Sequence, residues 1–529
     1  MKRFIKNKNQ EKTLKVDKQG RSIEDYIESI LSSKVYDVAQ VTPLDFAPNL
    51  SSRLNNEIFL KREDLQSVFS FKLRGAYNKV ALMNVDIRSA GIIAASAGNH
   101  AQGVAFAAKH LGVSSKIIMP TTTPKIKVDS VSRMGAQIIL HGDTYDDAYE
   151  YALVLAEQEG KSFIHPYDDP EVISGQGTIA VEILKQCQGS PHAVFIPVGG
   201  GGLIAGMATY IKHVSPSTKI IGVEPEDAPT LAIALQNNKR VLLEEVGIFA
   251  DGVAVRKIGK ETFRLARHFV DEVVLVSIDE ICAAVKDIFN DTRTLEEPAG
   301  ALSVAGMKKY IGEYQISGKV IIGINSGANV NFDRLRHVAE RAELGEGRET
   351  LFGVTIPERP GSFREFCESI GKRDISEFNY RYQDDKNANV FVGIKFEDAA
   401  NEKPELTKEL EKKGYQIIDL SDNEMAKLHL RHMVGGHSSE DLNEVLYRFE
   451  FPERPGALLR FLNKIGKAWN ISLFHYRNHG SAYGRVLVGI QVPEEDIAKF
   501  NSFLESVGYS YHQETQNKAY RLFLNNPLK

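Results

Sequence analysis

Cysteine is scarce in this chain of 529 residues. The three cysteines, Cys187, Cys282 and Cys367, lie far apart and form no CxxC pair. An odd and sparse set argues against a disulfide framework or a zinc site. It indicates a reducing compartment, so we expect a cytoplasmic protein. Positive charge is not in surplus either, because the net charge is −4. This balance argues against nucleic acid or an anionic membrane as the main partner.

Long hydrophobic runs are also missing. The first six residues are basic but no apolar core follows them, so they predict no signal peptide. Residues 192–211 contain no acidic residue and no lysine, but four consecutive glycines stand in their middle. A continuous membrane helix is therefore not expected, and we predict a buried strand, a turn and a buried helix. Residues 1–22 are polar and are expected to be loose.

The pattern of apolar residues indicates the fold class. With this length, and with 43% hydrophobic and 25% charged residues, two to four globular domains are expected. From about residue 91 to 340, short unbroken apolar runs alternate with helical patterns, which is typical of an α/β protein with mostly parallel sheets. Thr123 and Pro124 predict a helix start, with the threonine as N-cap. The predicted strands are 91–95, 116–119, 136–140, 193–198, 219–223 and 319–324.

The remainder of the chain contains an internal repeat. Residues 356–363 (IPERPGSF) match residues 451–458 (FPERPGAL), and residues 390–394 (VFVGI) match residues 486–490 (VLVGI). Each copy predicts a strand, a Pro-Gly turn, a helix, a strand, a hairpin and a strand, so the repeat implies two small α+β domains packed as a pair. The predicted division of the chain is an N-terminal extension at 1–22, a main domain at 23–344, and repeat domains at 345–425 and 443–525.

A lysine at a predicted helix start is the first motif with chemical potential. It stands in Ser70-Phe71-Lys72-Leu73-Arg74-Gly75-Ala76. A lysine is a good nucleophile only when its pKa is lowered, and Phe69 and Phe71 could provide the apolar setting that does so. Taken alone, the motif is better explained by a surface lysine beside an ordinary helix cap.

Three further motifs each follow an apolar strand. Residues 96–103 (SAGNHAQG) would place N–H groups at a helix N-terminus, which favours an anion, and Asn99 could hydrogen-bond a ring hydroxyl. Residues 199–203 (GGGGL) could enclose a phosphate, although they match neither a Walker A loop nor a good dinucleotide motif. Residues 325–329 (NSGAN) place a hydroxyl that could face a ring nitrogen. Each is also an ordinary turn when taken alone, and His100 is interpreted as structural.

Together and in this order, the motifs resemble those of fold-type II pyridoxal 5'-phosphate (PLP) enzymes, most closely the biosynthetic threonine dehydratases. The resemblance includes residues 61–66 (KREDLQ) and 297–301 (EPAGA), and it leaves out only about the first sixteen residues. It implies a tryptophan synthase β-like catalytic domain with two open parallel-type sheets, followed by two ACT-like regulatory domains. The implied reaction is deamination of L-threonine, and also of L-serine, by β-elimination of water. Threonine would give 2-oxobutanoate and ammonia.

The same resemblance implies a role for each motif. Lys72 would carry PLP as a Schiff base and take the Cα proton of the substrate. Many transaminases have an aspartate at the ring nitrogen of the cofactor, whereas this chain would have a serine there. The serine predicts a milder electron sink, which favours elimination over transamination. The other implied cofactor contacts are Phe71, Asn99 at the 3'-oxygen, Gly199, Gly200, Gly201, Gly202 and Leu203 at the phosphate, and Ser326 at the ring nitrogen. The implied turn for the substrate carboxylate is Ser96, Ala97, Gly98, Asn99 and His100.

The two-copy tail resembles the regulatory part of the biosynthetic enzymes. It implies feedback inhibition by isoleucine, the end product of the pathway that the reaction would open, with valine opposing it in a homotetramer. Leucines at helical spacing are also typical of a core, so both interpretations stay open. The candidate effector residues are Gly361, Phe363, Gly456, Leu458, Leu459, Leu462, Tyr380 and Tyr476.

Other functions are compatible with parts of the pattern. A serine racemase or dehydratase is disfavoured by the tail, and a threonine synthase or cystathionine synthase by the extended motif match. An intact Lys72 argues against a catalytically silent amino-acid sensor. Glu224 follows a buried strand and resembles a cation ligand of related racemases. The further acidic ligand expected there is replaced by Thr230, so no metal is predicted.

Overall fold

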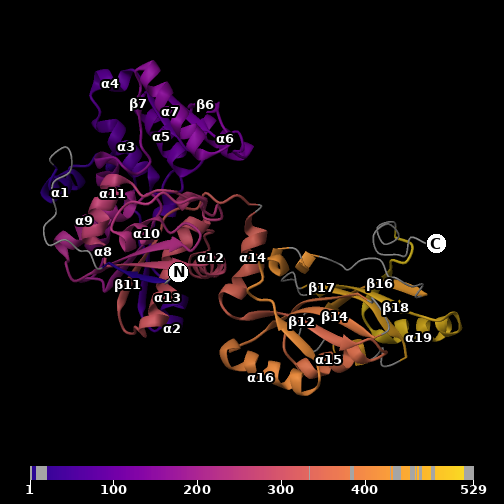
Figure 1. Cartoon of the computed structure of the whole chain (residues 1–529). Helices are drawn as coiled ribbons and strands as arrows, with labels where there is room; N and C mark the ends of the chain where they lie inside the picture. The colour runs from indigo at the N-terminus through magenta and orange to yellow at the C-terminus, as the bar shows by residue number, and fades with distance from the viewer. Residues whose placement is uncertain are drawn as a thin grey trace. The chain divides into compact units, whose positions relative to one another are not determined.

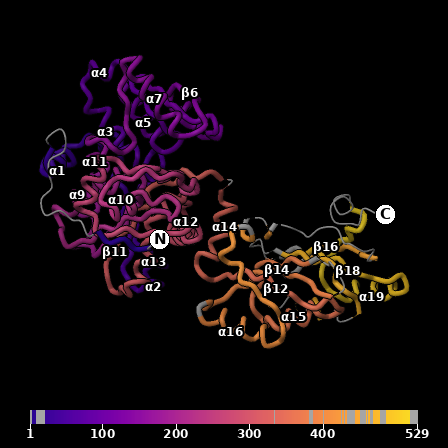
Figure 2. The backbone as a smooth tube through the Cα atoms, viewed as in Figure 1, coloured from indigo at the N-terminus to yellow at the C-terminus, as the bar shows by residue number. Residues whose placement is uncertain are grey.

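The fold is described from a computed structural model of the chain (Figure 1 and Figure 2). The structure describes residues 3–7, 21–332, 334–381, 386–428, 430–432, 443–452, 459, 461–463, 468–477 and 483–517. The chain divides into two compact units, Met1–Gly345 and Glu346–Lys529, and each has a hydrophobic core of its own. None of the helices in these ranges combines the length and the apolar composition that crossing a bilayer requires.

The main sheet of the first unit contains seven strands among the described residues. In spatial order they are β1 (Phe4–Lys6), β10 (Glu272–Val276), β9 (Lys219–Pro225), β8 (Ala193–Pro197), β11 (Val320–Asn325), β3 (Glu57–Arg62) and β2 (Leu44–Phe46). The five central strands are parallel, whereas β1 and β2 are added antiparallel at the two edges. Unbroken apolar runs form the central strands because both faces of the sheet are covered.

Helices cover the sheets of the first unit. They are α1 (Ile23–Leu31), α2 (Pro48–Leu54), α3 (Lys72–Leu82), α4 (Val85–Ser89), α5 (Asn99–Leu111), α6 (Lys125–Ser132), α7 (Tyr145–Glu159), α8 (Pro170–Gln186), α9 (Gly202–Val214), α10 (Thr230–Asn237), α11 (Lys260–Phe269), α12 (Ile278–Thr292), α13 (Pro298–Tyr314) and α14 (Arg334–Gly345). Val194 and Ile196 of β8 pack with α8, α9 and α11, whereas Ala193 and Phe195 pack on the other face with α12 and α13. Alternate side chains of one strand therefore serve two cores.

A second, smaller sheet completes the first unit. Its strands in the described residues are β6 (Gln137–Leu140), β5 (Ser115–Met119), β4 (Ile92–Ala95) and β7 (Ser162–Phe163), and all of them are parallel. One face packs on α5 and the other on α7, and this lobe is drawn in indigo and purple at the top of Figure 1. The predicted α/β class with two parallel-type sheets is thus confirmed.

The second unit is one antiparallel sheet with helices. In spatial order its described strands are β15 (Gln416–Asp419), β12 (Glu349–Pro357), β14 (Asn387–Lys395), β13 (Ile375–Arg381), β17 (Asn470–Arg477), β18 (Tyr483–Gln491), β16 (Glu444–Pro452) and β19 (Ser510–Gln513). The helices are α15 (Ser362–Ile370), α16 (Ala399–Lys412), α17 (Glu424–Leu428) and α19 (Ile497–Val507). Strand β13 of the first copy pairs with β17 of the second, so the two copies share a continuous sheet.

A buried charge of the first copy has no counterpart at the matching position of the second. Arg431, in the segment between them, forms salt bridges with Glu349 (3.3 Å) and Glu377 (2.6 Å), and all three side chains are almost fully buried. The position of Glu377 in the first copy is occupied by Leu473 in the second. The segment between the copies is therefore anchored to the first copy through Arg431. The second copy lacks the carboxylate that would bind such an arginine at the matching position.

Two expectations from the sequence are wrong in detail. Residues 4–6 are not loose: Ile5 is buried and the Phe4 ring packs against Tyr314 at 5.8 Å between centroids, because these apolar side chains extend the sheet beside β10. Residues 8–20 lie outside the described part. Helix α6 begins at Lys125 with Pro124 as N-cap, because Pro124 has an extended ψ of 136°. All six predicted strands form, and their ends differ by at most two residues from the prediction.

Candidate active site

The loop before α3 is joined to the loop after β11. The Phe71 amide donates to the Ser326 carbonyl (3.2 Å), and the Ala328 amide donates to the Phe69 carbonyl (2.9 Å). Phe69 has a left-handed backbone with φ of 55°, which bends the chain into this contact. The first and fourth sequence motifs thus meet, and Lys72 is presented at the first position of α3 beside Ser326.

The Lys72 amine lies in a mostly apolar setting. Its Nζ donates to the Pro166 carbonyl (3.2 Å) and lies 5.3 Å from the centroid of the Phe71 ring. Burial lowers the pKa of Lys72 to about 8, and the carboxyl group of Glu297 opposes this shift. An appreciable fraction of the amine is therefore neutral near pH 7.5, which is the form that acts as nucleophile or base.

The four glycines at the turn from β8 into α9 present unpaired N–H groups. The carbonyl oxygens of Gly199 and Gly200 accept hydrogen bonds from the hydroxyls of Thr230 (3.2 Å) and Thr262 (2.7 Å). Within the ranges that the structure describes, the amides of residues 199–202 have no acceptor. A set of unpaired N–H groups at the start of a helix is an anion cradle, so this turn fits a phosphate group.

Glycine is required here by space and by conformation. A Cβ at Gly200 would lie 2.2 Å from ring carbons of Tyr167, and one at Gly199 would lie 2.9 Å from the Val253 Cα. Gly201 has φ of 92°, in the left-handed region that favours glycine. Leu203, in the first turn of α9, is buried behind them.

The Asn99 side chain is held at both ends of its amide. Nδ2 donates to Glu297 Oε1 (2.5 Å), and Oδ1 accepts from Asn329 Nδ2 (2.8 Å). Glu297 is buried, and burial together with the nearby Asp251 raises its pKa to about 7. Hydrogen bonding by Asn99 and the positive charges of Lys127 and Arg334 oppose that rise. The second motif is thus tied to the loop after β11 and to the 297–301 segment.

A buried neutral histidine lies in the first turn of α5, directly after the turn at 96–98. The Ser96 hydroxyl accepts from the Gly98 amide (3.2 Å), and Ala97 lies between them. His100 Nε2 lies 2.9 Å from the Ile164 carbonyl. Burial, and then the charge of Lys72, lower the pKa of His100 to about 3, so the imidazole is neutral at physiological pH and donates to this carbonyl. A neutral, internally bonded ring agrees with a structural role.

Polar groups after β11 are buried and weakly engaged. The Ser326 hydroxyl lies 3.5 Å from the Ala299 carbonyl, which is a long contact for an O–H donor. Neither side-chain atom of the buried Asn325 has a hydrogen-bond partner in the described part of the chain. Buried polar groups without close partners indicate a ligand, so the Ser326 hydroxyl is available to an atom of a bound cofactor.

A loop that the sequence reasoning missed covers the glycine turn. Tyr167 packs on Gly200, and the neighbouring Pro166 carbonyl accepts from Lys72. His165 Nδ1 accepts from the amides of Tyr167 (3.2 Å) and Asp168 (2.8 Å), and the Asp168 carboxylate in turn caps α11. No glycine run or periodic pattern marks this loop. Glu297 was recognised as part of a motif, but its contact with Asn99 was not foreseen.

Glu224 is occupied by the protein itself. Its carboxylate accepts from the Thr230 hydroxyl (2.9 Å) and from the amides of Leu231 (2.8 Å) and Ala232 (2.9 Å). Burial raises its pKa to about 7 although these hydrogen bonds oppose the rise. Glu224 therefore caps α10. Among the residues that the structure describes, no group of three or more His, Cys, Asp or Glu side chains is arranged to hold a metal.

The candidate effector residues lie mostly in the core of the second unit. The Phe363 ring packs against Phe378 (4.6 Å between centroids) and against Phe474 of the second copy (4.9 Å). Gly361 has φ of 93° and is the N-cap of α15. Gly456 and Leu458 lie outside the described residues. The others belong to the core cluster, with Leu459 only partly buried: Leu459, Leu462, Tyr380 and Tyr476.

The fold and the site define a pyridoxal-phosphate dependent enzyme. Residues 35–327 match the family model "Pyridoxal-phosphate dependent enzyme". Residues 340–430 and 435–524 match "C-terminal regulatory domain of Threonine dehydratase". Among solved structures, threonine deaminase isoform 2 of Solanum lycopersicum is similar, with a TM-score of 0.61 and 47% identity over 64% of this chain and 92% of that one. Maize serine racemase has a TM-score of 0.56 and 30% identity, over 60% of this chain and 96% of that one.

Whole-length relatives narrow the assignment. The L-threonine dehydratase biosynthetic IlvA of Burkholderia multivorans is 54% identical over 94% of this chain and 99% of its own length. The enzyme of the same name in Escherichia coli is 52% identical over 94% and 97%. The mitochondrial threonine dehydratase of Saccharomyces cerevisiae is 52% identical over 97% and 91%. This chain belongs to the biosynthetic threonine dehydratase family, and its cofactor is PLP, as the resemblance implied.

Proposed function

We propose that this chain deaminates L-threonine to 2-oxobutanoate and ammonia in the cytoplasm. L-serine would be a second substrate. This reaction would be the first committed step of isoleucine biosynthesis. One observation carries the proposal: the lowered-pKa amine of Lys72 lies in the same unit as the unpaired amides of residues 199–202, in a chain matched over 94% of its length by named threonine dehydratases.

Lys72 is proposed to hold the cofactor and to move the substrate proton. When bound, PLP supplies an electron sink that stabilises negative charge at the substrate Cα. Because its pKa is lowered to about 8, the released Lys72 amine can accept the Cα proton at neutral pH. The Pro166 carbonyl, which accepts from Nζ in this structure, orients the amine.

Other residues are proposed to bind and orient. The amides of Gly199 to Gly202, with Leu203 behind them, would hold the phosphate group. Asn99, fixed by Glu297 and Asn329, would meet the ring oxygen, and the Ser326 hydroxyl the ring nitrogen. The turn of residues 96–100 at the start of α5 would receive the substrate carboxylate, and Phe71 would contact the cofactor. His100 adds no charge there because its imidazole is neutral.

Chemical trapping tests this assignment. Borohydride reduction of the holoenzyme followed by peptide mapping should place the cofactor on Lys72, and threonine should yield 2-oxobutanoate. Lys72→Ala should abolish both, whereas Lys109→Ala, which removes an exposed lysine from α5, should abolish neither. A reduced adduct at another lysine would reject the site. Faster turnover of O-phosphohomoserine than of threonine would reject the substrate.

The second unit is proposed to bind isoleucine as an inhibitor, with valine opposing it, in a homotetramer. Support comes from the match of both copies to a threonine dehydratase regulatory domain. The candidate residues near Gly361 and Phe363 lie where the copies touch: Asn470 of the second copy donates to Glu358 of the first (2.9 Å). Removing residues 346–529 should leave a dehydratase that isoleucine does not inhibit. Retained inhibition would reject the assignment, and light scattering of the full chain tests the tetramer.

A further inference from the structure

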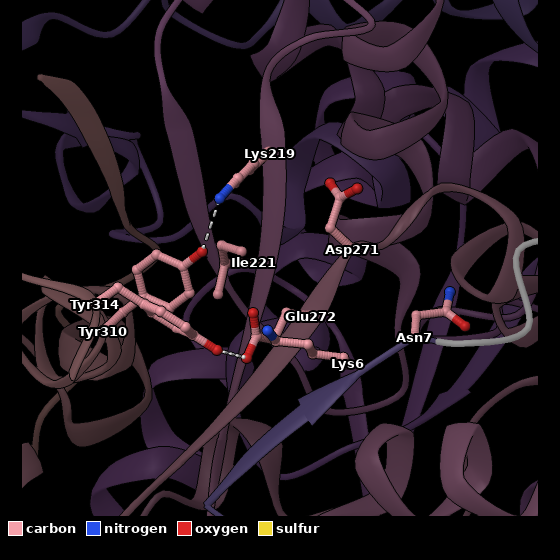
Figure 3. Close-up of a pocket in the computed structure, with 8 residues that line it drawn as sticks. All are labelled: Lys6, Asn7, Lys219, Ile221, Asp271, Glu272, Tyr310 and Tyr314. Atoms are coloured by element: carbon pink, nitrogen blue, oxygen red, sulfur yellow. Dashed lines mark hydrogen bonds between the residues drawn. The ribbon is translucent and has the colours of Figure 1, made fainter. Parts of the chain in front are cut away.

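A cavity lies at the edge of the main sheet opposite to the glycine turn. Its volume is about 320 Å³, and Figure 3 shows the residues that line it. The glycine turn follows the carboxyl end of β8, whereas this cavity is lined by Lys219 and Glu272, the first residues of β9 and β10. In a parallel sheet these ends form opposite edges, so the cavity is separate from the candidate active site.

Four elements build the cavity. Strand β1 contributes Lys6, β9 contributes Lys219, β10 contributes Glu272, and α13 contributes Tyr310 and Tyr314. Glu272 and Tyr310 are buried and form the floor, whereas both lysines are exposed at the mouth. The Lys6 ammonium lies 5.3 Å from the centroid of Tyr314, and the Lys219 ammonium lies 5.9 Å from that of Tyr310. Each ammonium thus rests on an aromatic ring, which holds it in place without neutralising it.

The acidic groups of the cavity already have partners inside the protein. Asp271 forms a salt bridge with Lys212 (2.8 Å) and accepts from the Ile220 amide (2.7 Å). Glu272 accepts from the Tyr314 hydroxyl (2.7 Å), as Figure 3 shows. Burial raises the pKa of Glu272, while Tyr314 and the two lysines oppose that rise.

The two lysines of the cavity, in contrast, are not paired. In the part of the chain that the structure describes, neither Lys6 nor Lys219 forms a salt bridge. The hydrogen bond from the Lys219 ammonium to the Tyr310 hydroxyl is long (3.3 Å). With Asp271 neutralised by Lys212, the cavity contains two ammonium groups against the single carboxyl group of Glu272. The unbalanced charge is positive and lies at the mouth.

We propose that this cavity binds a small organic or inorganic anion, through a carboxylate or phosphate group held between Lys6 and Lys219. Ammonium groups donate strong charge-assisted hydrogen bonds to such oxygens, and the Tyr310 hydroxyl offers a further partner. A volume near 320 Å³ stands at the lower end of small-molecule sites and corresponds to about ten water molecules. Glu272 on the floor repels anionic groups that reach below the lysines, so a compact anion held at the mouth fits.

The site depends on the pairing of β1 with β10. Lys6 lies directly opposite Glu272 in that pairing, and the neighbouring Asn7 side chain fastens the strand to the carbonyls of Arg267 (2.8 Å) and Val270 (2.8 Å). A ligand that contacts Lys6 binds only the paired form, so binding must stabilise β1 in the sheet. Residues that lie outside the family resemblance would thus complete a site on the catalytic unit.

Calorimetry on the PLP-loaded full chain tests the proposal, with inorganic phosphate and oxalate as separate probes in a buffer that contains neither. We expect saturable binding of at least one probe, weakened tenfold or more by Lys6→Gln and by Lys219→Gln. Lys239→Gln, which removes an exposed lysine two residues after α10, should leave binding unchanged, and Lys219→Arg should bind nearly as well as the parent protein. Hydrogen exchange of a β1 peptide should slow when the probe is bound.

The probes also separate the two ligand chemistries. Binding of phosphate alone identifies a phosphorylated ligand, and binding of oxalate alone identifies a carboxylate. Absence of saturable binding for both probes, or full binding by both glutamine variants, would overturn the proposal. Unchanged hydrogen exchange in β1 at saturating probe would do so as well.

Discussion

Arg74 is a position at which a single substitution should strongly perturb the catalytic unit. It lies two residues after Lys72 in α3 and is fully buried. Its guanidinium donates to both oxygens of Glu63 (2.7 and 2.8 Å) and to both oxygens of Glu182 (2.6 and 3.1 Å). Both carboxylates are buried, and Lys61, 2.6 Å from Glu182, is the other cation at this cluster. One arginine therefore balances charge at the start of the helix that presents Lys72.

Replacing Arg74 by methionine should lower the free energy of unfolding of the first unit by about 3–5 kcal/mol at pH 7.5. Breaking a buried ion pair costs this much because the remaining charges stay buried without a partner. The four hydrogen bonds to carboxylates, at roughly 1.5–3 kcal/mol each, would give a larger sum, but such terms are not additive. Arg74→Lys keeps the charge without the forked geometry, so its effect should be intermediate.

The effect should also depend on pH. Burial by itself would raise the pKa of Glu63, but the charge and hydrogen bonds of Arg74, together with Lys61 and the Thr42 hydroxyl, hold that pKa below its ordinary value of 4.5. In the parent protein, the stability that Glu63 contributes is complete above pH 4.5 and is lost as the pH falls through the lowered pKa. Without Arg74, burial should raise the pKa of Glu63. In acid, Glu63 of the variant then becomes protonated, which removes the free-energy cost of burying its unpaired charge. The difference between the proteins should therefore shrink from pH 7.5 towards pH 5.

Urea unfolding at both pH values measures this difference, with hydrogen exchange of α3 peptides as the readout for the first unit. Arg133→Met, at an exposed position after α6, is the matched control and should change stability by less than about 0.5 kcal/mol. A loss below about 1 kcal/mol for Arg74→Met at pH 7.5 would refute the reasoning. A loss that grows towards pH 5 would refute the assignment of charge to Glu63.

Three further predictions concern other buried positions. Because the pKa of Glu297 is raised to about 7, ionisation of this group lowers the stability of the parent protein as the pH rises above about 4.5. In urea unfolding, Glu297→Gln should therefore gain up to about 3 kcal/mol of stability relative to the parent between pH 5 and pH 8. A difference that does not change with pH would contradict this. Gly200→Ala should weaken PLP binding by the apoenzyme tenfold or more in a titration. Gly312→Ala, in α13 with open space around it, should bind PLP normally and should unfold at a higher urea concentration than the parent. Equal PLP affinities of the two variants would reject the steric argument. Arg431→Met should destabilise the second unit by about 3–5 kcal/mol, because two buried glutamates lose their cation. Hydrogen exchange of β12 and β13 measures this loss. Unchanged protection would show that the two glutamates are protonated.

Much of the candidate site could be predicted because its parts are local in sequence. Each glycine or serine motif directly follows an apolar strand, and the carboxyl ends of parallel strands are where ligands bind in open α/β sheets. The position of the turn at 199–202 therefore follows from strand, turn and helix patterns, whereas the roles of this turn and of Lys72 were predicted from the family resemblance. The partners could not be found in this way. Asn99 and Glu297 are 198 positions apart, and only the folded sheets show that the amide of one meets the carboxyl group of the other.

The loop at 164–169 and strand β1 were missed for a different reason. Sequence patterns reveal an element when its side chains alternate over several residues, and a three-residue strand is too short for that. What stabilises β1 is tertiary: Ile5 enters the core of the main sheet, and Phe4 packs on Tyr314. Likewise, the Tyr167 ring occupies the space that a side chain at position 200 would fill. Its position therefore depends on a glycine in another segment of the chain. An anion site at β1 could not be predicted either, because Lys6 and Lys219 become neighbours only once that short strand is paired. Whether β1 stays paired therefore decides whether Lys6 joins Lys219 at the cavity, and hydrogen exchange in β1 measures that pairing.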